Sequence, residues 1–239
     1  MTQKSQSILI KGLKSKIITP EDNLFEVLQK SLKKSGELKD GDVIVITSKV
    51  VAITQGRVIK IKNKKQFNAL VRKEADKFYD HTLTLKDGIF IAWAGIDRSN
   101  IPNGYGVLWP KKPFKVAEEI QKKLRKAWKL KKIGVMITDS CCVPLRRGVH
   151  AVTLGYFGYE GVEDLRGKKD IYGKKLKVTQ RAVADNLANA AQLIMGESRE
   201  RMPFAIISNA PVQWSNKKVP KKCLLIDAKK CLFAPMYRS

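Results

Sequence analysis

The sequence has few of the residues that build metal–thiolate sites or disulfide frameworks. Its 239 residues include two histidines and four cysteines. Cys141 and Cys142 are adjacent, and no two cysteines have the CxxC spacing of a zinc or redox motif. Adjacent cysteines bridge each other only with strain. We therefore expect free thiols, no structural zinc site and a reducing compartment.

Long hydrophobic runs are also missing. No apolar run approaches the roughly 20 residues that cross a bilayer, and the opening residues, MTQKSQSILIKG, contain no apolar segment of signal-peptide length. We expect a cytoplasmic protein with no membrane partner. Aromatic residues make up only 8% of the chain, and we interpret the four tryptophans as packing residues. The hydrophobic fraction of 44% indicates a folded globular protein.

Negative charge is scarce in this chain. Asp and Glu number 22 against 47 Lys and Arg, which gives a net charge of +25. Such an excess favours anionic partners, including nucleotides, polycarboxylates, nucleic acid and membrane surfaces. However, 36 of the cationic residues are lysines scattered along the whole sequence, whereas a single binding face more often has clustered arginines. A lysine-rich, solvated surface is therefore an equally good interpretation.

Hydrophobic periodicity predicts an α/β chain. Apolar, partly β-branched runs predict buried strands over Ser7–Ile10, Val43–Thr47, Val58–Ile61, Ile89–Ala94, Ile133–Thr138, Val149–Phe157, Phe204–Ile207 and Cys223–Ile226. Amphipathic spacing and terminal signals predict helices from Thr19-Pro20 to Gly36 and over Gln66–Tyr79, Phe114–Leu130 and Gln180–Met195. We find no internal repeat or low-complexity tract.

The stretch Ile133–Gly148 carries the strongest local signal. Its apolar strand is expected to end at Thr138, so that Asp139 and Ser140 leave the strand together. In open α/β sheets, ligands bind beyond the carboxyl ends of the strands. Arg146 and Arg147 follow in the same loop and suit phosphate or carboxylate groups. This pattern indicates a phosphate-handling site, although a carboxylate that only caps the next turn is the alternative.

A second apolar strand also delivers an aspartate at its end. Ile89–Ala94 is followed by Gly95-Ile96-Asp97, so Asp97 and Asp139 come from two separate strands of one α/β chain. Two aspartates placed in this way suggest a shared pocket. Carboxylate oxygens are ligands that suit Mg²⁺ or Mn²⁺, and we therefore predict a metal role for this pair.

Short motifs stand along the chain in a distinctive order. They are DGD at 40–42, TSKVV at 47–51, GR at 56–57, AGID at 94–97, SN at 99–100, GV at 134–135, ITDS at 137–140, RG at 147–148, GKKDIYG at 167–173, VT at 178–179, VAD at 183–185 and MGE at 195–197. In order and spacing they resemble the coenzyme F420-0:γ-glutamyl ligase family. The resemblance covers roughly Gly12 to Pro203.

The resemblance implies a fold and a reaction. The fold would be a two-lobed α/β unit of residues 1–239, with mixed sheets and packed helices, that forms an intertwined homodimer. The reaction would be a GTP-dependent ligation of the L-glutamate amine to a carboxylate of an anionic cofactor precursor. That carboxylate would first be phosphorylated, and the amine would then displace phosphate. Such chemistry uses Mg²⁺ or Mn²⁺ and cationic donors to neutralise charge.

The resemblance also implies roles for individual positions. Asp97 and Asp139 resemble ligands of a first metal ion, Ser140 stands where the family has a threonine that serves a second, and Glu197 is a further predicted ligand. The positions that resemble the cofactor-binding contacts are Gly12, Leu13, Ser48, Asn100 and Tyr172. The predicted catalytic residues are Asp139, Arg147 and Asp170.

The chain also departs from the family pattern. Ile53 replaces a lysine expected near the nucleotide, and Gln55 replaces an acid. The other departures are Cys142-Val143 in place of Gly-Arg, Asn186 in place of Glu, and Ser208-Asn209 in place of Arg-Gly. The metal-type acids are thus retained while anion contacts differ. We interpret this as altered substrate recognition rather than loss of chemistry.

Three functional hypotheses follow. The first is addition of glutamate to F420-0 itself, and the second is the same chemistry on a pteroate-type folate precursor. The third is a catalytically silent nucleotide- or nucleic-acid-binding homologue, for which binding would weaken steeply with salt and ignore Mg²⁺. The two ligase hypotheses instead predict nucleotide turnover that requires a divalent metal and glutamate. We favour a ligase and do not expect a nucleic-acid partner.

Overall fold

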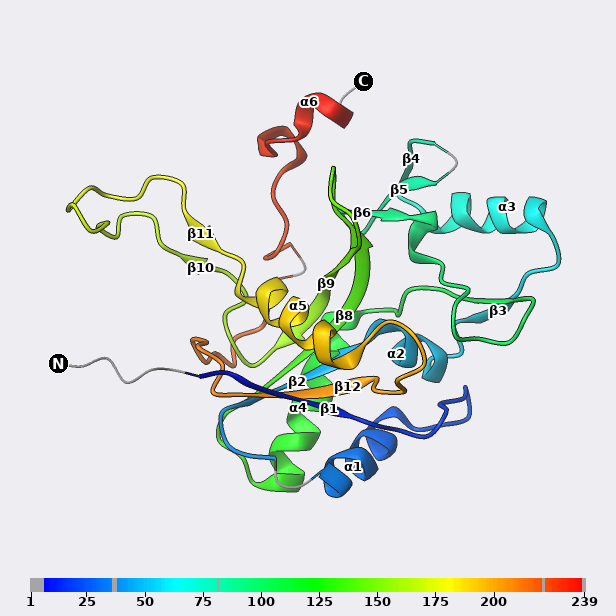
Figure 1. The fold of residues 1–239 in the computed structure, drawn as a ribbon, viewed down its shortest axis with the longest axis horizontal. Helices are drawn as coiled ribbons and strands as arrows, with labels where there is room; N and C mark the ends of the chain where they lie inside the picture. The colour runs from blue at the N-terminus through cyan, green and yellow to red at the C-terminus, as the bar shows by residue number, and fades with distance from the viewer. Residues whose placement is uncertain (1–6, 36–37, 81, 221, 238–239) are drawn as a thin grey trace.

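A five-stranded mixed sheet lies at the centre of the molecule (Figure 1). The structure is a computed structural model that describes residues 7–35, 38–80, 82–220 and 222–237. The order of the strands is β1 (Leu9–Leu13), β12 (Phe204–Ser208), β2 (Asp42–Thr47), β8 (Ile133–Cys142) and β9 (Val149–Phe157). β2 and β8 are parallel, and the other neighbours are antiparallel. The predicted mixed α/β class is confirmed.

Helices cover both faces of this sheet. α1 (Leu24–Ser35) and α4 (Pro113–Trp128) lie on one face and α5 (Val183–Met195) lies on the other, as Figure 1 shows. Side chains alternate between the faces of a strand. In β8, Ile137 accordingly packs with α1 and α4 while Met136 packs with α5. Cover on both sides explains why these strands have continuous apolar runs rather than alternating ones.

β8 is longer than the sequence predicted. We expected the strand to end at Thr138, but it continues to Cys142, with Asp139 opposite Val152 of β9. β2 ends at Thr47, which pairs with Thr138, so beyond this point only β9 flanks β8. Polar residues are tolerated in this last part of β8 because β2 no longer pairs with that edge of the strand. Asp139 therefore still lies at the carboxyl end of the sheet, although it is inside a strand.

Residues 58–107 form a smaller part beside the sheet. Its elements are β3 (Val58–Lys60), α3 (Lys64–Glu74), β4 (Lys77–Phe78), β5 (Leu83–Lys86), β6 (Ile89–Ala92), the 3₁₀ turn η1 (Trp93–Gly95) and β7 (Tyr105–Val107). β3 pairs with β7, and β4, β5 and β6 form a meander. A separate apolar cluster that includes Val71, Ile96 and Leu108 holds this part together.

A long arm leaves the body between β9 and α5. It begins and ends in the short antiparallel pair β10 (Glu163–Asp164) and β11 (Gln180–Arg181). Figure 1 shows the segment between these strands projecting away from the sheet. The described chain ends in η2 (Ala228–Lys230) and α6 (Ala234–Tyr237). No helix of the described ranges is long and apolar enough to span a membrane.

Several predicted boundaries are wrong for local reasons. The first helix begins after Asn23 rather than at Thr19, because the Asn23 side chain accepts hydrogen bonds from the backbone N–H groups of Phe25 and Glu26. Thr19 forms a turn with Asp22 instead.

Four other elements also differ from the prediction. The first strand spans Leu9–Leu13 rather than Ser7–Ile10. The helix predicted over Gln66–Tyr79 ends at Glu74, where the chain turns into β4, and Cys223–Ile226 contains a turn and no strand. The last predicted helix begins at Val183, because Gln180 and Arg181 pair with the other strand of the arm.

Candidate functional site

A short buried helix begins at the carboxyl end of β2. This helix, α2 (Ser48–Thr54), was not predicted, because its apolar residues directly continue the apolar run of the strand. Its first two side chains face the acids of the neighbouring strands. The Ser48 side chain lies beside the carboxylate of Asp139 and acts to lower its pKa, and the Lys49 ammonium pairs with Asp97 at 2.5 Å. α2 thus brings the two predicted strand-end aspartates together.

Asp139 is a partly buried residue whose carboxylate is held by neutral donors. Its Oδ2 accepts from the indole N–H of Trp109, and its carboxylate also interacts with the Ser140 backbone N–H and the Ser48 hydroxyl. Burial raises the pKa of Asp139 to about 6, while these donors act to lower it and the nearby negative charge of Asp97 acts to raise it. Among the residues that the structure describes, this carboxylate therefore has no cationic counter-charge of its own.

Asp97 has the opposite electrostatic setting. Burial acts to raise the pKa of this carboxyl, but the Lys49 ammonium and the Ser99 backbone and hydroxyl donors outweigh it, and the pKa is lowered. The Ser99 N–H lies 2.7 Å from Oδ1. Lys49 also reaches the carbonyl oxygen and hydroxyl of Ser99 at 3.1 Å. Asp97 is therefore ionised and fixed in orientation.

Ser140 and Glu197 meet on the other face of β8. The Ser140 hydroxyl donates to Glu197 Oε1 at 2.8 Å, and the Gln192 amide of α5 donates to both side chains, at 3.1 and 2.5 Å respectively. Successive strand residues point to opposite faces. The four predicted metal-site residues thus form two pairs, Asp97 with Asp139 and Ser140 with Glu197.

The pair of aspartates fits a hard divalent cation bound together with a substrate. In the described ranges, no three His, Cys, Asp or Glu side chains come close enough to enclose a metal ion. Mg²⁺, however, is usually held by one or two carboxylates, with water and substrate phosphates completing its shell. Asp97 and Asp139 offer only oxygen donors, and within the described ranges the Asp139 carboxylate has no paired cation. Both features suit that arrangement.

The predicted nucleotide-contact positions lie in different parts of the structure. Asn100 lies near the aspartate pair and donates from Nδ2 to the carbonyl oxygen of Ser198 at 2.8 Å, which ties two loops together. Gly12 and Leu13 lie inside β1, whereas the predicted first strand ended at Ile10. The Leu13 side chain is buried in the core, so any ligand contact at this position is left to the backbone.

Three predicted site residues lie outside this group of acids. Arg147 is exposed in the connection between β8 and β9. Asp170 and Tyr172 lie in the projecting arm, where Asp170 Oδ1 accepts from the backbone N–H groups of Tyr172 and Lys174 at 2.9 and 2.8 Å. Tyr172 is 83% exposed. Within one chain, these residues are not brought to Asp139.

Three of the departures from the family pattern have structural explanations. Ile53 is buried in the main core, where a lysine charge would be costly. The Gln55 side chain donates to the Lys111 carbonyl oxygen at 3.1 Å and accepts from its N–H at 2.7 Å. An ionised acid could accept but not donate, so glutamine fixes this loop by both groups. The Ser208 hydroxyl donates to buried Asp42 at 2.7 Å.

Three residues of this site were not predicted from the sequence. Lys49 follows Ser48 at the end of a predicted strand. Its ion-pair partner, Asp97, lies 48 positions further along the chain, and no sequence pattern links the two residues. Trp109 was predicted to pack; it does pack in an apolar cluster, and its N–H also binds Asp139. Gln192 lies on the face of α5 that meets Ser140, a position that helical spacing alone could have suggested.

Comparison with known proteins identifies the family. A sequence model described as F420-0:Gamma-glutamyl ligase matches residues 12–209. Coenzyme F420:L-glutamate ligase of Methanopyrus kandleri is 32% identical over 231 residues, which cover 87% of this chain and 89% of that protein. The protein of the same name from Methanocaldococcus jannaschii is 35% identical over 203 residues, covering 76% and 80%. The chain that places Asp97 beside buried Asp139 therefore belongs to the F420-0:γ-glutamyl ligase family.

Proposed function

We propose that this chain is a nucleotide- and metal-dependent ligase that joins the amine of L-glutamate to a carboxylate of F420-0 or a similar cofactor precursor. The observation that carries the proposal is the pair formed by Asp97 and buried Asp139 at the carboxyl end of the sheet. Its relatives are named for ligation of L-glutamate to coenzyme F420. GTP is the proposed nucleotide, with ATP as the comparison.

The proposed reaction has two steps. An oxygen of the acceptor carboxylate attacks the γ-phosphorus of GTP, the bond to the β-phosphate oxygen breaks, and GDP leaves. The glutamate amine then attacks the carbonyl carbon of the acyl phosphate, phosphate leaves with the electron pair of the broken C–O bond, and the nitrogen loses a proton to form the amide. Bound Mg²⁺ or Mn²⁺ would neutralise charge on the transferred phosphoryl group.

The residues of this chain position the charges for that reaction. Asp97 and Asp139 are the residues that would hold the cation. Lys49 keeps Asp97 ionised, and Ser48 and Trp109 fix the Asp139 carboxylate. Because these contacts exist in the folded chain before any substrate is bound, little reorganisation is needed during the reaction. Ser140 and Glu197 are proposed as a second oxygen-donor pair on the opposite side of β8.

A second copy of the chain is proposed to complete the site. Asp170 and Tyr172 lie on an arm that carries three exposed apolar side chains, Ile171, Tyr172 and Val178, each more than 80% exposed. Exposed apolar groups on a projecting segment are typical of protein–protein contacts. An intertwined homodimer would bury them and would bring the arm to the partner.

The proposed function is tested by turnover with defined substrates. Purified protein is incubated with GTP or ATP, Mg²⁺ or Mn²⁺, L-glutamate and either F420-0 or dihydropteroate, and mass spectrometry follows the glutamylated product while phosphate release is measured. Asp139→Asn removes one carboxylate oxygen ligand with little change in shape and is expected to reduce kcat by about 100-fold or more. Product formation without added metal, or full activity of this variant, would contradict the proposal.

A matched control accompanies this variant. Asp227→Asn changes the same charge at an exposed position, where the side chain accepts from the backbone N–H of Lys229. Asparagine caps a helical turn as well as aspartate does. The control is therefore expected to keep wild-type kcat and stability.

A further inference from the structure

Helix α5, which lies beside β9 in Figure 1, has three polar side chains in one row. Asp185, Asn189 and Gln192 have the spacing i, i+4 and i+7, which places residues on one face of a helix. All three are partly buried, and each contacts the β8–β9 pair. Polar groups in such a position are kept in place by the hydrogen bonds that they form.

The first two side chains of the row fix α5 along β9. Asp185 Oδ1 accepts from the backbone N–H of Thr153 at 2.9 Å, and Asn189 Oδ1 accepts from that of Ala151 at 3.0 Å. The Asn189 amide also donates to the Ala151 carbonyl oxygen at 3.0 Å. β9 is an edge strand, so side chains of α5 take the place of a further strand here. Sliding of the helix along the strand would break these bonds, and α5 is therefore held in one register.

That register brings Gln192 to the proposed second oxygen-donor pair. Ala151 stands opposite Ser140 in the strand pair, and Gln192 lies about one helical turn beyond Asn189. The Gln192 amide nitrogen donates to the Ser140 hydroxyl at 3.1 Å and to Glu197 Oε1 at 2.5 Å. An ionised carboxylate can only accept hydrogen bonds, so the nitrogen of the amide has to face Glu197.

These hydrogen bonds leave both ligand groups able to bind a cation. A hydroxyl has one donor hydrogen and two acceptor lone pairs. The Ser140 hydrogen goes to Glu197, and one lone pair accepts from Gln192, so the second lone pair remains for a cation. On Glu197 both bonds fall on Oε1 and leave Oε2 for the same ion. No ion pair found in the described ranges involves Glu197.

We propose that Gln192 is a positioning residue for a divalent cation. Its neutral amide orients the Ser140 hydroxyl and the Glu197 carboxylate together and leaves the negative charge of the carboxylate for the ion. The inference rests on the proposed function, in which these two residues are the second oxygen-donor pair. Loss of a group that orients metal ligands typically weakens metal binding about 10- to 100-fold.

Titration of the full chain with MnCl₂, without nucleotide, tests this role. Electron paramagnetic resonance of free Mn²⁺ gives the Kd independently of turnover. The titrations use the Asp139→Asn chain, which lacks the first proposed cation site, and Glu197→Gln in that chain identifies the remaining site. Gln192→Met keeps the length and helix propensity of the side chain but removes the amide. It is expected to raise the Kd for Mn²⁺ about tenfold or more.

The matched control is Gln29→Met in α1. It makes the same change at a partly buried position of a helix on the opposite face of the sheet. The Kd for Mn²⁺ is expected to stay within about twofold of the value without this substitution.

Gln192→Lys separates a positioning role from a purely structural one. The new ammonium would pair with Glu197, so the melting temperature is expected to equal or exceed that of Gln192→Met. The same charge opposes a cation, so Mn²⁺ is expected to bind still more weakly than in Gln192→Met. If Gln192 only stabilised the fold, the Kd would not rise while the melting temperature is maintained. A Kd for Gln192→Lys equal to that of the unsubstituted position therefore overturns the proposal.

The outcomes distinguish this inference from the proposed reaction, for which turnover is measured with Asp139 intact. Unchanged Mn²⁺ affinity in both Gln192 variants, in an enzyme that turns over, overturns the role of Gln192 and leaves the reaction standing. Weakened Mn²⁺ binding in these variants, without turnover by the wild type, supports the role and contradicts the reaction. If the Asp139→Asn chain binds no Mn²⁺ that Glu197→Gln removes, the inference is overturned.

Discussion

Each acidic side chain near the carboxyl end of the sheet is neutralised in a different way. Asp97 has the Lys49 ammonium, and Glu197 accepts from a hydroxyl and an amide. In the described part of the chain, Asp139 has only neutral donors, so burial dominates and its pKa rises to about 6. A buried carboxylate without its own cation is the group most in need of an added positive charge. This difference makes Asp139 the centre of the proposed site.

Glu74 shows what a fully paired acid contributes at the residue scale. Its carboxylate lies 2.8 Å from Arg57 and 2.9 Å from Lys86, and the Lys86 ammonium also donates to the Glu74 carbonyl oxygen. Glu74→Gln leaves two cations beside each other. Since the group is partly solvated, we expect a loss of about 2 kcal/mol of unfolding free energy, less than the ~3–5 kcal/mol of fully buried pairs. Denaturation in urea at pH 7 measures it.

The loss of unfolding free energy caused by Glu74→Gln should disappear in acid. Burial acts to raise the pKa of Glu74, but Lys86 and Arg57 outweigh it and hold the pKa below 4.5. The stabilisation is therefore complete above the unfolded pKa and is lost as the pH falls through the folded value. The difference between wild type and Glu74→Gln should shrink below about pH 4.5. Glu118→Gln, at an exposed pair with Lys122, is the control and should change stability by less than about 0.5 kcal/mol.

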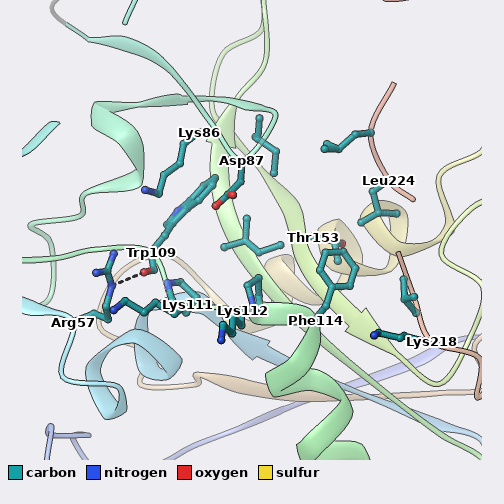
Figure 2. Close-up of a pocket in the computed structure, with 16 residues that line it drawn as sticks. Arg57, Lys86, Asp87, Trp109, Lys111, Lys112, Phe114, Thr153, Lys218 and Leu224 are labelled. Atoms are coloured by element: carbon teal, nitrogen blue, oxygen red, sulfur yellow. Dashed lines mark hydrogen bonds between the residues drawn. The ribbon is translucent and has the colours of Figure 1, made fainter. Parts of the chain in front are cut away.

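At the scale of elements, the contact of β9 with the start of α4 shapes a cavity of about 530 Å³ at the free edge of β9 (Figure 2). Gly155 lies in β9 directly against the first turn of α4. A Cβ atom at this position would lie 2.4 Å from the Phe114 backbone nitrogen and 2.6 Å from the Pro113 carbonyl carbon. Only glycine allows the helix to approach this closely, and the approach places Lys112 and Phe114 at the cavity wall.

Gly155→Ala is therefore expected to destabilise the fold. The first turn of α4 would have to move, because both obstructing atoms are backbone atoms, and overpacking of this kind costs about 1–3 kcal/mol. The measurement is the unfolding free energy. Unchanged stability would show that the two elements are not in tight contact.

The prediction of elements succeeded where one physical signal dominated. β9 was predicted over Val149–Phe157 and is found there, and α4 lies within two residues of its predicted ends, because apolar runs and amphipathic spacing are local properties. α2 was missed because its apolar residues continue a strand without a break. The end of β8 was misplaced because it depends on where β2 stops, and that is a contact between distant segments.

At the scale of the whole molecule, the chain exposes an arm that has no partner within the described structure. Arg147, Asp170 and Tyr172 all lie on projecting, exposed segments and away from Asp139. If the protein is a homodimer, as proposed, the exposed side chains of Ile171 and Val178 are buried between two copies. Burial of apolar area stabilises such an association.

The dimer proposal predicts a change in mass. In sedimentation equilibrium, the wild type should have twice the chain mass of 26.9 kDa. Ile171→Asp with Val178→Asp should weaken association at least tenfold and reduce turnover in parallel, since buried charges oppose the contact. Ile17→Asp, at another exposed apolar position, is the control and should remain dimeric. A monomeric wild type with full activity would contradict the proposal.

The sequence by itself determined the α/β class, the main strands and helices, and the family, because these depend on local periodicity and on motifs fixed in order and spacing. It also marked Asp97 and Asp139 as a pair, since both follow apolar runs. Only the tertiary structure decided that Lys49 neutralises one and Trp109 binds the other. It alone set Ser140 and Glu197 on the opposite face and opened the cavity at the edge of β9, because those arrangements arise from contacts between segments far apart in the chain.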